Sequence, residues 1–206
     1  MSSNARRAVM TALHLGALPK SPTVELVTTD LSKGEQRAPA FLRMNPNGRV
    51  PVLEDDGFYL TESHAIMQYL AEKTPGQKLY PTDGRARADV NRWLFWCAHH
   101  FQPAMSVLNW ENFVKPMIGR GATDPVEVKR GEALVADVCG VLDAHLAGRE
   151  WIAGDSLTLA DLALSTPLAS TVSAKLPVTQ YANIQAWFGR VQELDVARKL
   201  VAGLDR

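Results

Sequence analysis

The stretch that decides the fold spans residues 45–73 and reads NPNGRVPVLEDDGFYLTESHAIMQYLAEK. Residues 50–53 are rich in valine and leucine and predict a strand, Asp56-Gly57 is a typical hairpin turn, and residues 58–60 form the returning strand. Apolar side chains then recur at helical spacing, which predicts a helix from residue 61 or 62 to residue 72. The stretch therefore predicts a β-hairpin followed directly by a helix.

The chain before this stretch predicts a helix, a strand and a second helix. Residues 3–15 read as a helix that ends at Gly16. The segment SPTVELVTTD alternates Val24, Leu26 and Thr28 on one face and predicts a short strand. The segment GEQRAPAFLRMNP predicts a short, irregular helix that stops before Pro46.

The chain after it changes character. The segment KTPGQKLYPTDG, residues 73–84, holds two prolines and two glycines, and no convincing strand follows it. Long helices are expected over residues 85–113, with a kink at Pro103, over 124–147, from SLTLADLAL onward, and over about 181–193. We therefore predict an α/β domain over residues 1–74, a linker over 75–84 and an all-helical domain over 85–206.

Composition excludes several classes of protein. The 206 residues carry 22 basic and 22 acidic side chains, so no net charge favours nucleic acid or an anionic membrane. No segment resembles a signal peptide or a membrane span. Cys97 and Cys139 lie far apart and have no metal-ligand spacing, and the neighbouring His99 and His100 point in different directions on a helix. These features predict a reduced, cytoplasmic protein without a metal.

One helix start carries a purely structural signal. Thr158 can cap the helix while Asp161, three residues later, reaches back to the cap amide, and Leu157 and Leu162 are placed to pack against each other. We interpret this capping box as a determinant of helix geometry and not as part of an active site.

Four segments together resemble the soluble glutathione transferases. NPNGRVPVLED is similar to the family's N-P-x-G-x-V-P strand entry, TESHAIMQYLAEK to its E-S-x-A-I helix start, LYP at residues 79–81 to its linker end, and WIAGDSLTLADLAL to its capping motif. The order and spacing match over nearly the whole chain. The resemblance implies a thioredoxin-like domain followed by a helical domain, and in particular the bacterial-like, serine-using theta and delta types.

The resemblance implies a glutathione site in the first domain. Glu62 and Ser63 fall at a helix N-terminus, where free amides and the dipole attract the γ-glutamyl carboxylate and Glu62 can pair with the α-amino group. From the residues alone, a simple helix cap is the favoured interpretation. A cis Val50–Pro51 bond is implied beside the cysteinyl peptide, whereas the alternative is a trans proline that ends a ladder.

Three further residues belong to this expected site. Gln36 and Arg49 lie where family members contact the glycine end of glutathione, although an exposed arginine in a loop is also commonly just solvated. His64, inside the E-S-x-A-I segment, is interpreted as part of the wall of the site and not as a catalyst.

The resemblance places the catalytic group just before the first helix. Serine-using members have a serine four residues before an arginine there, which fits Ser2 before Arg6 and Ser3 before Arg7. The hydrophobic register favours Ser2 as the catalytic residue and Ser3 as the helix cap. The hydroxyl would donate a hydrogen bond to the glutathione sulfur and favour the thiolate, which attacks an electrophilic carbon without a metal.

The family's first strand is not visible in this sequence. Relatives have about seven to nine residues before the catalytic turn, where this sequence has only Met1. The resemblance implies that the missing strand lies between the TVELV strand and the VPVLED strand and pairs with both. Losing it would leave backbone groups of both neighbours unpaired. We therefore expect Met1 to be an internal methionine of a longer parent chain, the alternative being a rearranged sheet with a poorly held Ser2.

A second, apolar substrate is expected on the first long helix of the helical domain. The residues that share one face of this helix are Phe95, His99, Gln102, Ser106, Trp110 and Phe113. Core packing or contact with a second copy explains such a face equally well. We predict a homodimeric glutathione transferase; the alternatives are a non-catalytic scaffold of the same fold and a glutathione-dependent peroxidase, isomerase or dehalogenase.

Overall fold

The structure is a computed structural model that describes residues 2–16 and 24–202. Contacts divide the chain into two units, Met1–Gln77 with Asp195–Arg206, and Lys78–Leu194. We describe each unit by itself. Helix α10 (Asp195–Ala202) packs on α1 and so belongs to the first unit, whereas the sequence analysis counted its residues with the helical domain.

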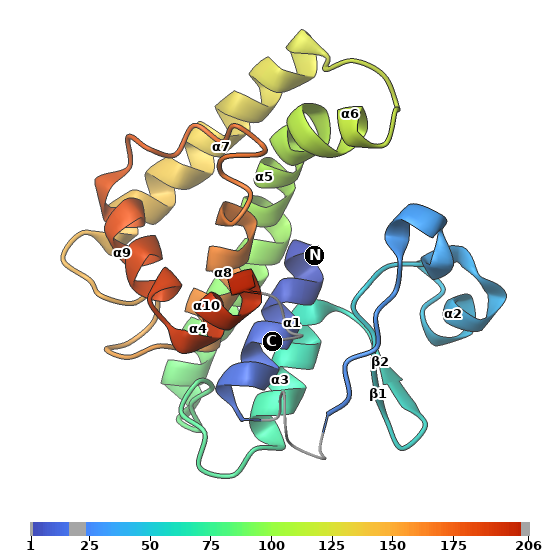
Figure 1. Cartoon of the computed structure of the whole chain (residues 1–206). Helices are drawn as coiled ribbons and strands as arrows, with labels where there is room; N and C mark the ends of the chain where they lie inside the picture. Colours follow the sequence, from blue (N-terminus) through green and yellow to red (C-terminus); the bar gives the residue numbers. More distant parts are fainter. Residues whose placement is uncertain (1, 17–23, 203–206) are drawn as a thin grey trace. The chain divides into compact units, whose positions relative to one another are not determined.

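The first unit combines short helices with a two-stranded sheet (Figure 1). Its elements in chain order are α1 (Ser3–His14), η1 (Leu31–Lys33), η2 (Glu35–Arg37), α2 (Pro39–Met44), β1 (Leu53–Asp55), β2 (Phe58–Leu60) and α3 (Ser63–Glu72). Helix α1 packs against α3, and its apolar side chains form much of the unit's core. The hairpin and the helix after it are formed as predicted, but the first strand begins at Leu53 and not at residue 50.

The hairpin turn explains the register of the two strands. Leu53 pairs with Leu60 and Asp55 pairs with Phe58 in an antiparallel ladder. Asp56 and Gly57, between them, both have positive φ, 51° and 84°, which is the conformation of a type I′ turn.

A polar contact holds the hairpin against α3. The Tyr69 hydroxyl donates to Asp55 Oδ2 at 2.5 Å, and Lys73 Nζ lies 2.5 Å from the same oxygen. These contacts lower the pKa of the Asp55 carboxyl, first through the hydrogen bond from Lys73 and then through that from Tyr69.

The strand predicted over Val24, Leu26 and Thr28 is not formed. These residues lie in irregular backbone, and the Leu26 and Val27 side chains are 44% and 77% exposed. A strand needs a neighbour that accepts its backbone hydrogen bonds, and among the described residues the sheet contains β1 and β2 alone. Met1 and residues 17–23 lie outside the described residues, so the expectation about Met1 remains a prediction.

The second unit is helical throughout its described length. Its long first helix is continuous but not uniform: α4 (Gly84–Trp96) and α5 (Gln102–Asn109) are joined by the π-helical turn η3 (Cys97–Phe101), and a second π-helical turn, η4 (Trp110–Val114), leads into α6 (Lys115–Met117). Pro103, which has no N–H to donate, directly follows the wider turn η3, and the kink expected there remains a prediction.

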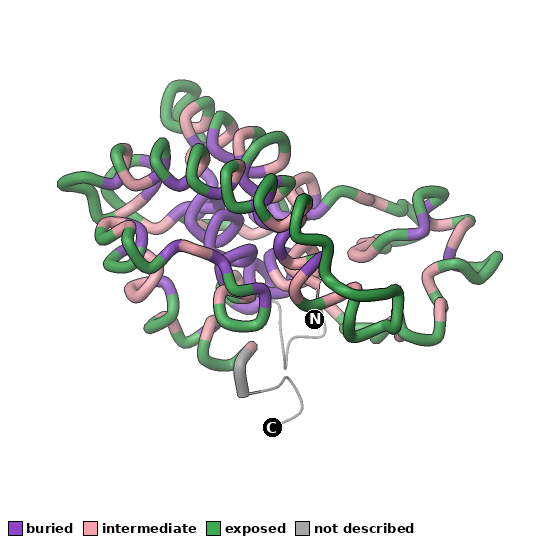
Figure 2. The backbone as a smooth tube through the Cα atoms, turned by 90° about the horizontal axis from the view of Figure 1, so that it is seen from above, coloured by how far each residue is buried: buried purple, intermediate pink, exposed green. Residues whose placement is uncertain are grey.

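The core of the second unit is centred on α8. Helices α7 (Pro125–Leu146), α8 (Leu159–Leu168) and α9 (Ala182–Gln192) complete the unit, and every residue of α8 is buried. Figure 2 shows buried backbone concentrated in this unit, whereas the segment from residue 24 to residue 62 is mainly exposed or intermediate. Of the helices in the described part of the chain, none is long and apolar enough to span a membrane.

The predicted capping box is present at the start of α8. Thr158 Oγ1 accepts from the Ala160 amide at 3.3 Å, while the Thr158 amide donates to Asp161 Oδ2 at 2.8 Å. The other oxygen of Asp161 accepts from the Ile152 amide and from Trp187 Nε1, each at 2.9 Å. Burial raises the pKa of this carboxyl, although all of these donors oppose the shift. Asp161 thus joins the start of α8 to a loop and to α9.

Candidate functional site

The N-terminus of α3 is not closed by a side chain. Glu62 occupies the N-cap position but makes no capping hydrogen bond, and its φ of 63° lies in the left-handed region. For a residue with a side chain this conformation costs on the order of 1–3 kcal/mol, and such strain is typical of ligand sites. The first-turn amides have no acceptor within the helix, and the helix dipole makes this end positive. The arrangement can therefore receive an anionic group.

The N-terminus of α1 is also without a side-chain cap. Ser2 lies at the N-cap position, where its carbonyl accepts from the Arg6 amide at 2.8 Å, but its side chain makes no capping hydrogen bond. The prediction that Ser3 is the cap is wrong, because Ser3 is the first residue of the helix and Ser2 occupies the N-cap position. Burial lowers the pKa of the nearby Arg6. The side chain is still a cation at neutral pH, because arginine is not deprotonated in proteins.

A part-buried side-chain pair joins the N-terminal halves of these two helices. Arg7 is fully buried in the α1 core, and its Nη1 lies 2.6 Å from His64 Nε2 on α3. Arginine can only donate, so this contact is a hydrogen bond in the tautomer whose Nε2 accepts and whose hydrogen is on Nδ1. Thr11 Oγ1 donates to the Arg7 carbonyl at 2.9 Å. The sequence did not predict this pair. The one local sign of it is an arginine, Arg7, among the apolar residues that α1 buries.

The loop before the hairpin is organised by Asn45. Its side-chain amide donates to the Arg49 carbonyl at 2.7 Å, its Oδ1 accepts from the Asn47 amide at 3.1 Å, and the residue is buried. This loop leads into Val50–Pro51, whose peptide bond is cis, as the sequence resemblance implied. Arg49 itself is exposed at the surface of the loop.

Gly48 brings this loop close to Gln36. A Cβ at position 48 would lie 3.0 Å from the Gln36 carbonyl and 2.9 Å from Arg37 Nη1, and the φ of Gly48 is 59°. Both constraints require glycine here. The Gln36 Oε1 is buried without a hydrogen-bond partner among the described residues. The structure therefore brings the predicted residues Gln36 and Arg49 to the same loop cluster, with a polar atom available for a ligand.

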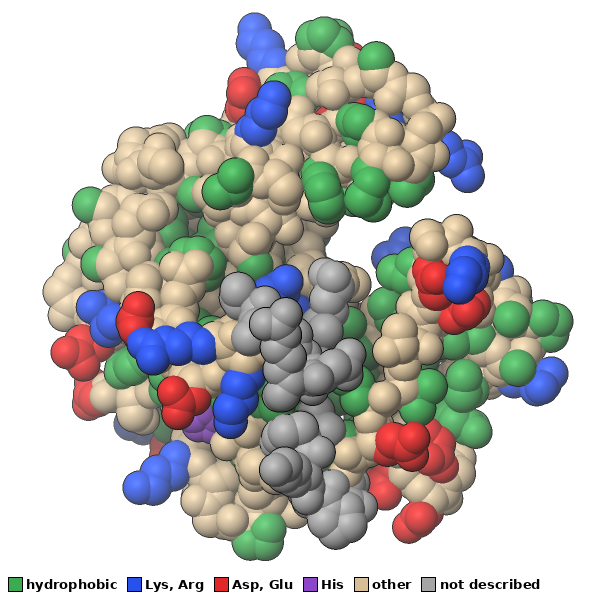
Figure 3. Space-filling model, viewed as in Figure 1, with side chains coloured by type: hydrophobic (Ala, Val, Ile, Leu, Met, Phe, Trp, Pro, Cys, Tyr) green, Lys and Arg blue, Asp and Glu red, His purple; other side chains and the backbone are tan. Residues whose placement is uncertain are grey.

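The six residues predicted for a second substrate share one face of the long helix in the second unit. Phe95, Trp110 and Phe113 are 63%, 43% and 40% exposed, and His99 and Ser106 are exposed as well. The sixth, Gln102, is half-buried and donates to Ser106 Oγ at 3.0 Å. The alternative that this face is core is therefore wrong. Figure 3 shows hydrophobic side chains gathered near the α5–α6 end, where Met117 and Ile118 are also exposed.

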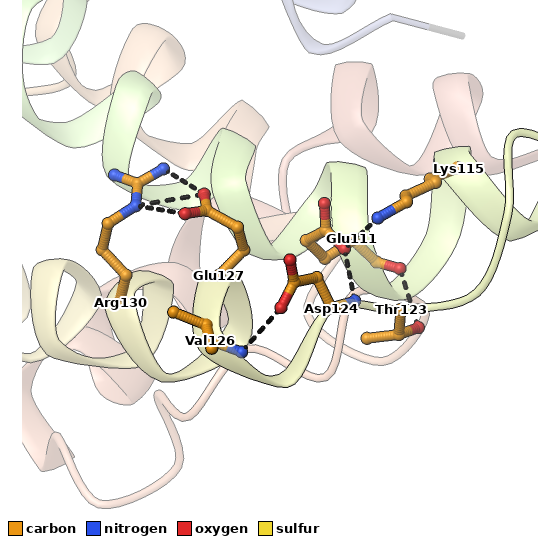
Figure 4. A network of polar contacts seen from close by, with 7 residues as sticks. All are labelled: Glu111, Lys115, Thr123, Asp124, Val126, Glu127 and Arg130. Atoms are coloured by element: carbon orange, nitrogen blue, oxygen red, sulfur yellow. Dashed lines mark hydrogen bonds and ion pairs between the residues drawn. The ribbon is translucent and has the colours of Figure 1, made fainter.

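A polar network stabilises this end of the helix from its other side (Figure 4). Glu111 is 4% exposed, and its Oε2 accepts from the Asp124 amide and from Lys115 Nζ, each at 2.8 Å. These donors lower the pKa of Glu111, the Asp124 amide contributing most. Thr123 Oγ1 donates to the Glu111 carbonyl at 3.0 Å, so the network fastens η4 to the segment that begins α7.

The cysteines do not offer a nucleophile. Cys97 and Cys139 are both buried, and neither forms a disulfide among the described residues. Burial, with a smaller effect of Asp143, raises the pKa of Cys139 to about 12, so its sulfur remains a thiol at neutral pH. Within residues 2–16 and 24–202, no three His, Cys, Asp or Glu side chains gather in a way that could hold a metal ion.

Comparison with known proteins identifies the family. Residues 4–72 match the family described as Glutathione S-transferase, N-terminal domain, and residues 97–195 match the corresponding C-terminal domain. Glutathione S-transferase 3 of Zea mays is 34% identical over 215 aligned residues, covering 95% of this chain and 96% of the maize protein. The chain belongs to the glutathione transferase family.

Solved structures of this family confirm the predicted fold class. A glutathione S-transferase-I bound with lactoylglutathione matches with a TM-score of 0.84 at 29% identity, over 98% of this chain and 95% of that one. A delta-class glutathione transferase of Nilaparvata lugens matches with a TM-score of 0.79 at 30% identity, over 97% and 88%. The expected likeness to bacterial-like theta and delta types was too narrow, since the maize relative matches over nearly its whole length.

Proposed function

We propose that this protein is a glutathione S-transferase that activates the glutathione thiol through the Ser2 hydroxyl. The observation that carries the proposal is the uncapped, strained N-terminus of α3 at Glu62, in a chain of the glutathione transferase family. A family member needs a place for the γ-glutamyl carboxylate, and the start of α3 offers first-turn amides that the Glu62 side chain does not cap.

Glutathione is proposed to lie along the first unit. Its γ-glutamyl carboxylate would accept from the start of α3 and from Ser63, while its amino group pairs with Glu62. Its cysteinyl peptide would pair with the backbone of Val50, beside Pro51. At the glycine end, Arg49 supplies a cation for the carboxylate, and Gln36 Oε1, buried without a partner among the described residues, can accept from the glycyl N–H.

The proposed chemistry needs only a hydrogen bond from Ser2. A thiol with a pKa near 8.5 is a few per cent thiolate at neutral pH, and lowering that pKa by about two units makes thiolate the main form. A hydroxyl that donates to the sulfur stabilises the thiolate relative to the thiol. The Ser2 side chain suits this task because it makes no capping hydrogen bond of its own. Ser3, inside the first turn, is the less favoured candidate.

The second substrate is proposed to be an apolar electrophile bound on the exposed face of the long helix. This face combines the aromatic rings of Phe95, Trp110 and Phe113 with polar groups from His99, Gln102 and Ser106. Aromatic surface binds an apolar ligand, while the interspersed polar groups orient it. The thiolate then attacks the electrophilic carbon and the leaving group departs, without a metal.

We also propose that the protein is a cytoplasmic homodimer, without a nucleic-acid or membrane partner. The equal numbers of acidic and basic residues and the exposed apolar rings of Phe58 and Tyr59 support this proposal. Light scattering of the purified protein measures the mass directly, and a mass equal to one chain would contradict the homodimer.

The central test is calorimetric titration of glutathione into the wild-type protein and into Ser2→Ala. We expect micromolar to millimolar affinity in both proteins, with conjugation of a chlorinated nitroaromatic lost only in Ser2→Ala. Ser156→Ala, on an exposed loop, is the matched control and should keep activity. Absence of glutathione binding would overturn the proposal and favour a non-catalytic scaffold. Binding with peroxide reduction but no conjugation would favour the peroxidase alternative.

A further inference from the structure

The Arg7–His64 pair lies between the two helix ends that the proposed function uses. Arg7 comes five residues after Ser2 and His64 two residues after Glu62, which places the pair about 7.5 Å and about 3 Å along the respective helix axes from these N-caps. Figure 1 shows α1 and α3 side by side and running in the same direction, so both N-termini lie at one end of the helix pair.

The surroundings of each side chain favour a hydrogen bond between Arg7 and His64. A guanidinium at 0% exposure requires nearby acceptors to offset the loss of hydration. A histidine in the first turn of a helix faces the positive end of the dipole, which favours the neutral ring. Neutral imidazole can accept at Nε2, and the 2.6 Å contact with Arg7 Nη1 uses that acceptor. The contact therefore supplies one acceptor to the Arg7 guanidinium and one donor to His64 Nε2.

We propose that His64 is a positioning residue that sets the Ser2 hydroxyl relative to the start of α3. This inference rests on the proposed function, because it concerns the same glutathione site. The bond between the N-terminal halves of α1 and α3 restricts sliding and rotation of one helix against the other. Since hydrogen bonds of catalytic value depend on displacements of less than 1 Å, this restraint decides whether Ser2 reaches the sulfur of a glutathione held at Glu62 and Ser63.

Three substitutions at one position separate this role from general stability. In His64→Gln the side-chain Oε1 takes nearly the place of Nε2 and can accept from Arg7. In His64→Asn the acceptor lies nearer the backbone, where Nδ1 was, and falls short of Arg7. His64→Leu removes the acceptor altogether. His14→Leu, at the exposed C-terminal end of α1, is the matched control.

We expect His64→Leu and His64→Asn to lower kcat at least tenfold while KM for glutathione changes less than threefold. The ultraviolet difference spectrum of bound glutathione, followed against pH, should show its thiol pKa rising in both variants. His64→Gln should restore the wild-type pKa and kcat within about threefold, and His14→Leu should leave both unchanged. If all three His64 variants lose activity in proportion to their melting temperatures, or if none loses activity, the positioning role is overturned.

A separate measurement distinguishes failure of this inference from failure of the proposed function. The ¹⁵N chemical shifts of the His64 ring report its tautomer in the wild-type protein without any glutathione. Hydrogen on Nδ1 with an acceptor at Nε2 supports the pair. Hydrogen on Nε2 overturns the inference even where the protein conjugates glutathione. A protein with the expected tautomer that binds no glutathione overturns the proposed function and removes the positioning role with it.

Discussion

The N-termini of α8 and α3 differ in whether a side chain caps them. At α8, Thr158 and Asp161 satisfy the first amides from within the chain. At α3, Glu62 occupies the same cap position without a capping bond and in a left-handed conformation. The first end is complete and buried, whereas the second is strained and open. A closed helix end indicates a folding signal, and an open one indicates a place for a ligand.

The difference extends to the two units. In the second unit Asp83 caps α4, Asp124 caps α7, and Asp143 on α7 accepts from the Asn183 and Ile184 amides at the start of α9. In the first unit neither α1 nor α3 has a side-chain cap. A carboxylate at a helix start stabilises the fold. The first unit forgoes this stabilisation at the two helix ends where we propose that glutathione binds.

Asp161→Asn should produce the largest loss of stability. An amide nitrogen would replace one carboxylate oxygen and face donors instead of accepting from them, so we expect a loss of about 3 kcal/mol in the free energy of unfolding. Urea denaturation measures this loss. Asp155→Asn, on the exposed loop before α8, is the control and should change stability little. An Asp161→Asn protein as stable as the wild type would show that the capped start of α8 does not contribute to the free energy of unfolding.

Ser2→Ala and Thr158→Ala should have opposite effects on activity and stability. Ser2 makes no capping bond, so Ser2→Ala should lower kcat/KM about 100-fold, the order of one lost transition-state donor, with unfolding free energy nearly unchanged. Thr158→Ala removes a cap and should cost about 1 kcal/mol of stability without affecting the chemistry. Steady-state kinetics and urea denaturation of both variants test the pair. A Ser2→Ala protein that is mainly destabilised would identify Ser2 as a cap.

Glu62→Gly should stabilise the fold and weaken glutathione binding at the same time. Glycine adopts positive φ without strain, and after its greater unfolded-state entropy is subtracted we expect a gain of about 1 kcal/mol. The loss of the carboxylate should lower glutathione affinity about tenfold. Lys175→Gly, at a φ of 51° in the second unit, is the matched control and should stabilise without changing affinity. Thermal unfolding and calorimetry measure both quantities, and unchanged affinity in Glu62→Gly would remove Glu62 from the site.

The smallest expected effect is a loss of folding stability in acid, through protonation of Glu111. The pKa of Glu111 is lowered from its ordinary value near 4.5, chiefly by the Asp124 amide. Its contribution is therefore present above that value and is lost as pH falls through the lower folded pKa. Between pH 5 and pH 3 the wild type should lose more stability than Glu111→Gln, in which position 111 no longer titrates. Urea midpoints across this range measure the difference, with Glu132→Gln, on the exposed side of α7, expected to follow the wild type.

Much of the fold could be predicted because its signals are local. The turn at Asp56-Gly57, the Thr158–Asp161 box and the helical periodicity of α3 each depend on residues a few positions apart. The strand over residues 24–28 was predicted wrongly for the same reason, since alternation of side chains does not supply the neighbouring strand that pairs with it.

By itself, the sequence determined the order of the elements, the capping signal of α8 and the motifs by which the chain resembles its family, because spacing and residue type carry that information. The tertiary structure decided that Ser2 and not Ser3 occupies the cap position of α1, that Glu62 adopts a left-handed conformation, and that Arg7 meets His64 across 57 positions of the chain. The reason is physical: these features exist only once α1 and α3 have packed. A local sequence pattern does not predict that Arg7 contacts His64.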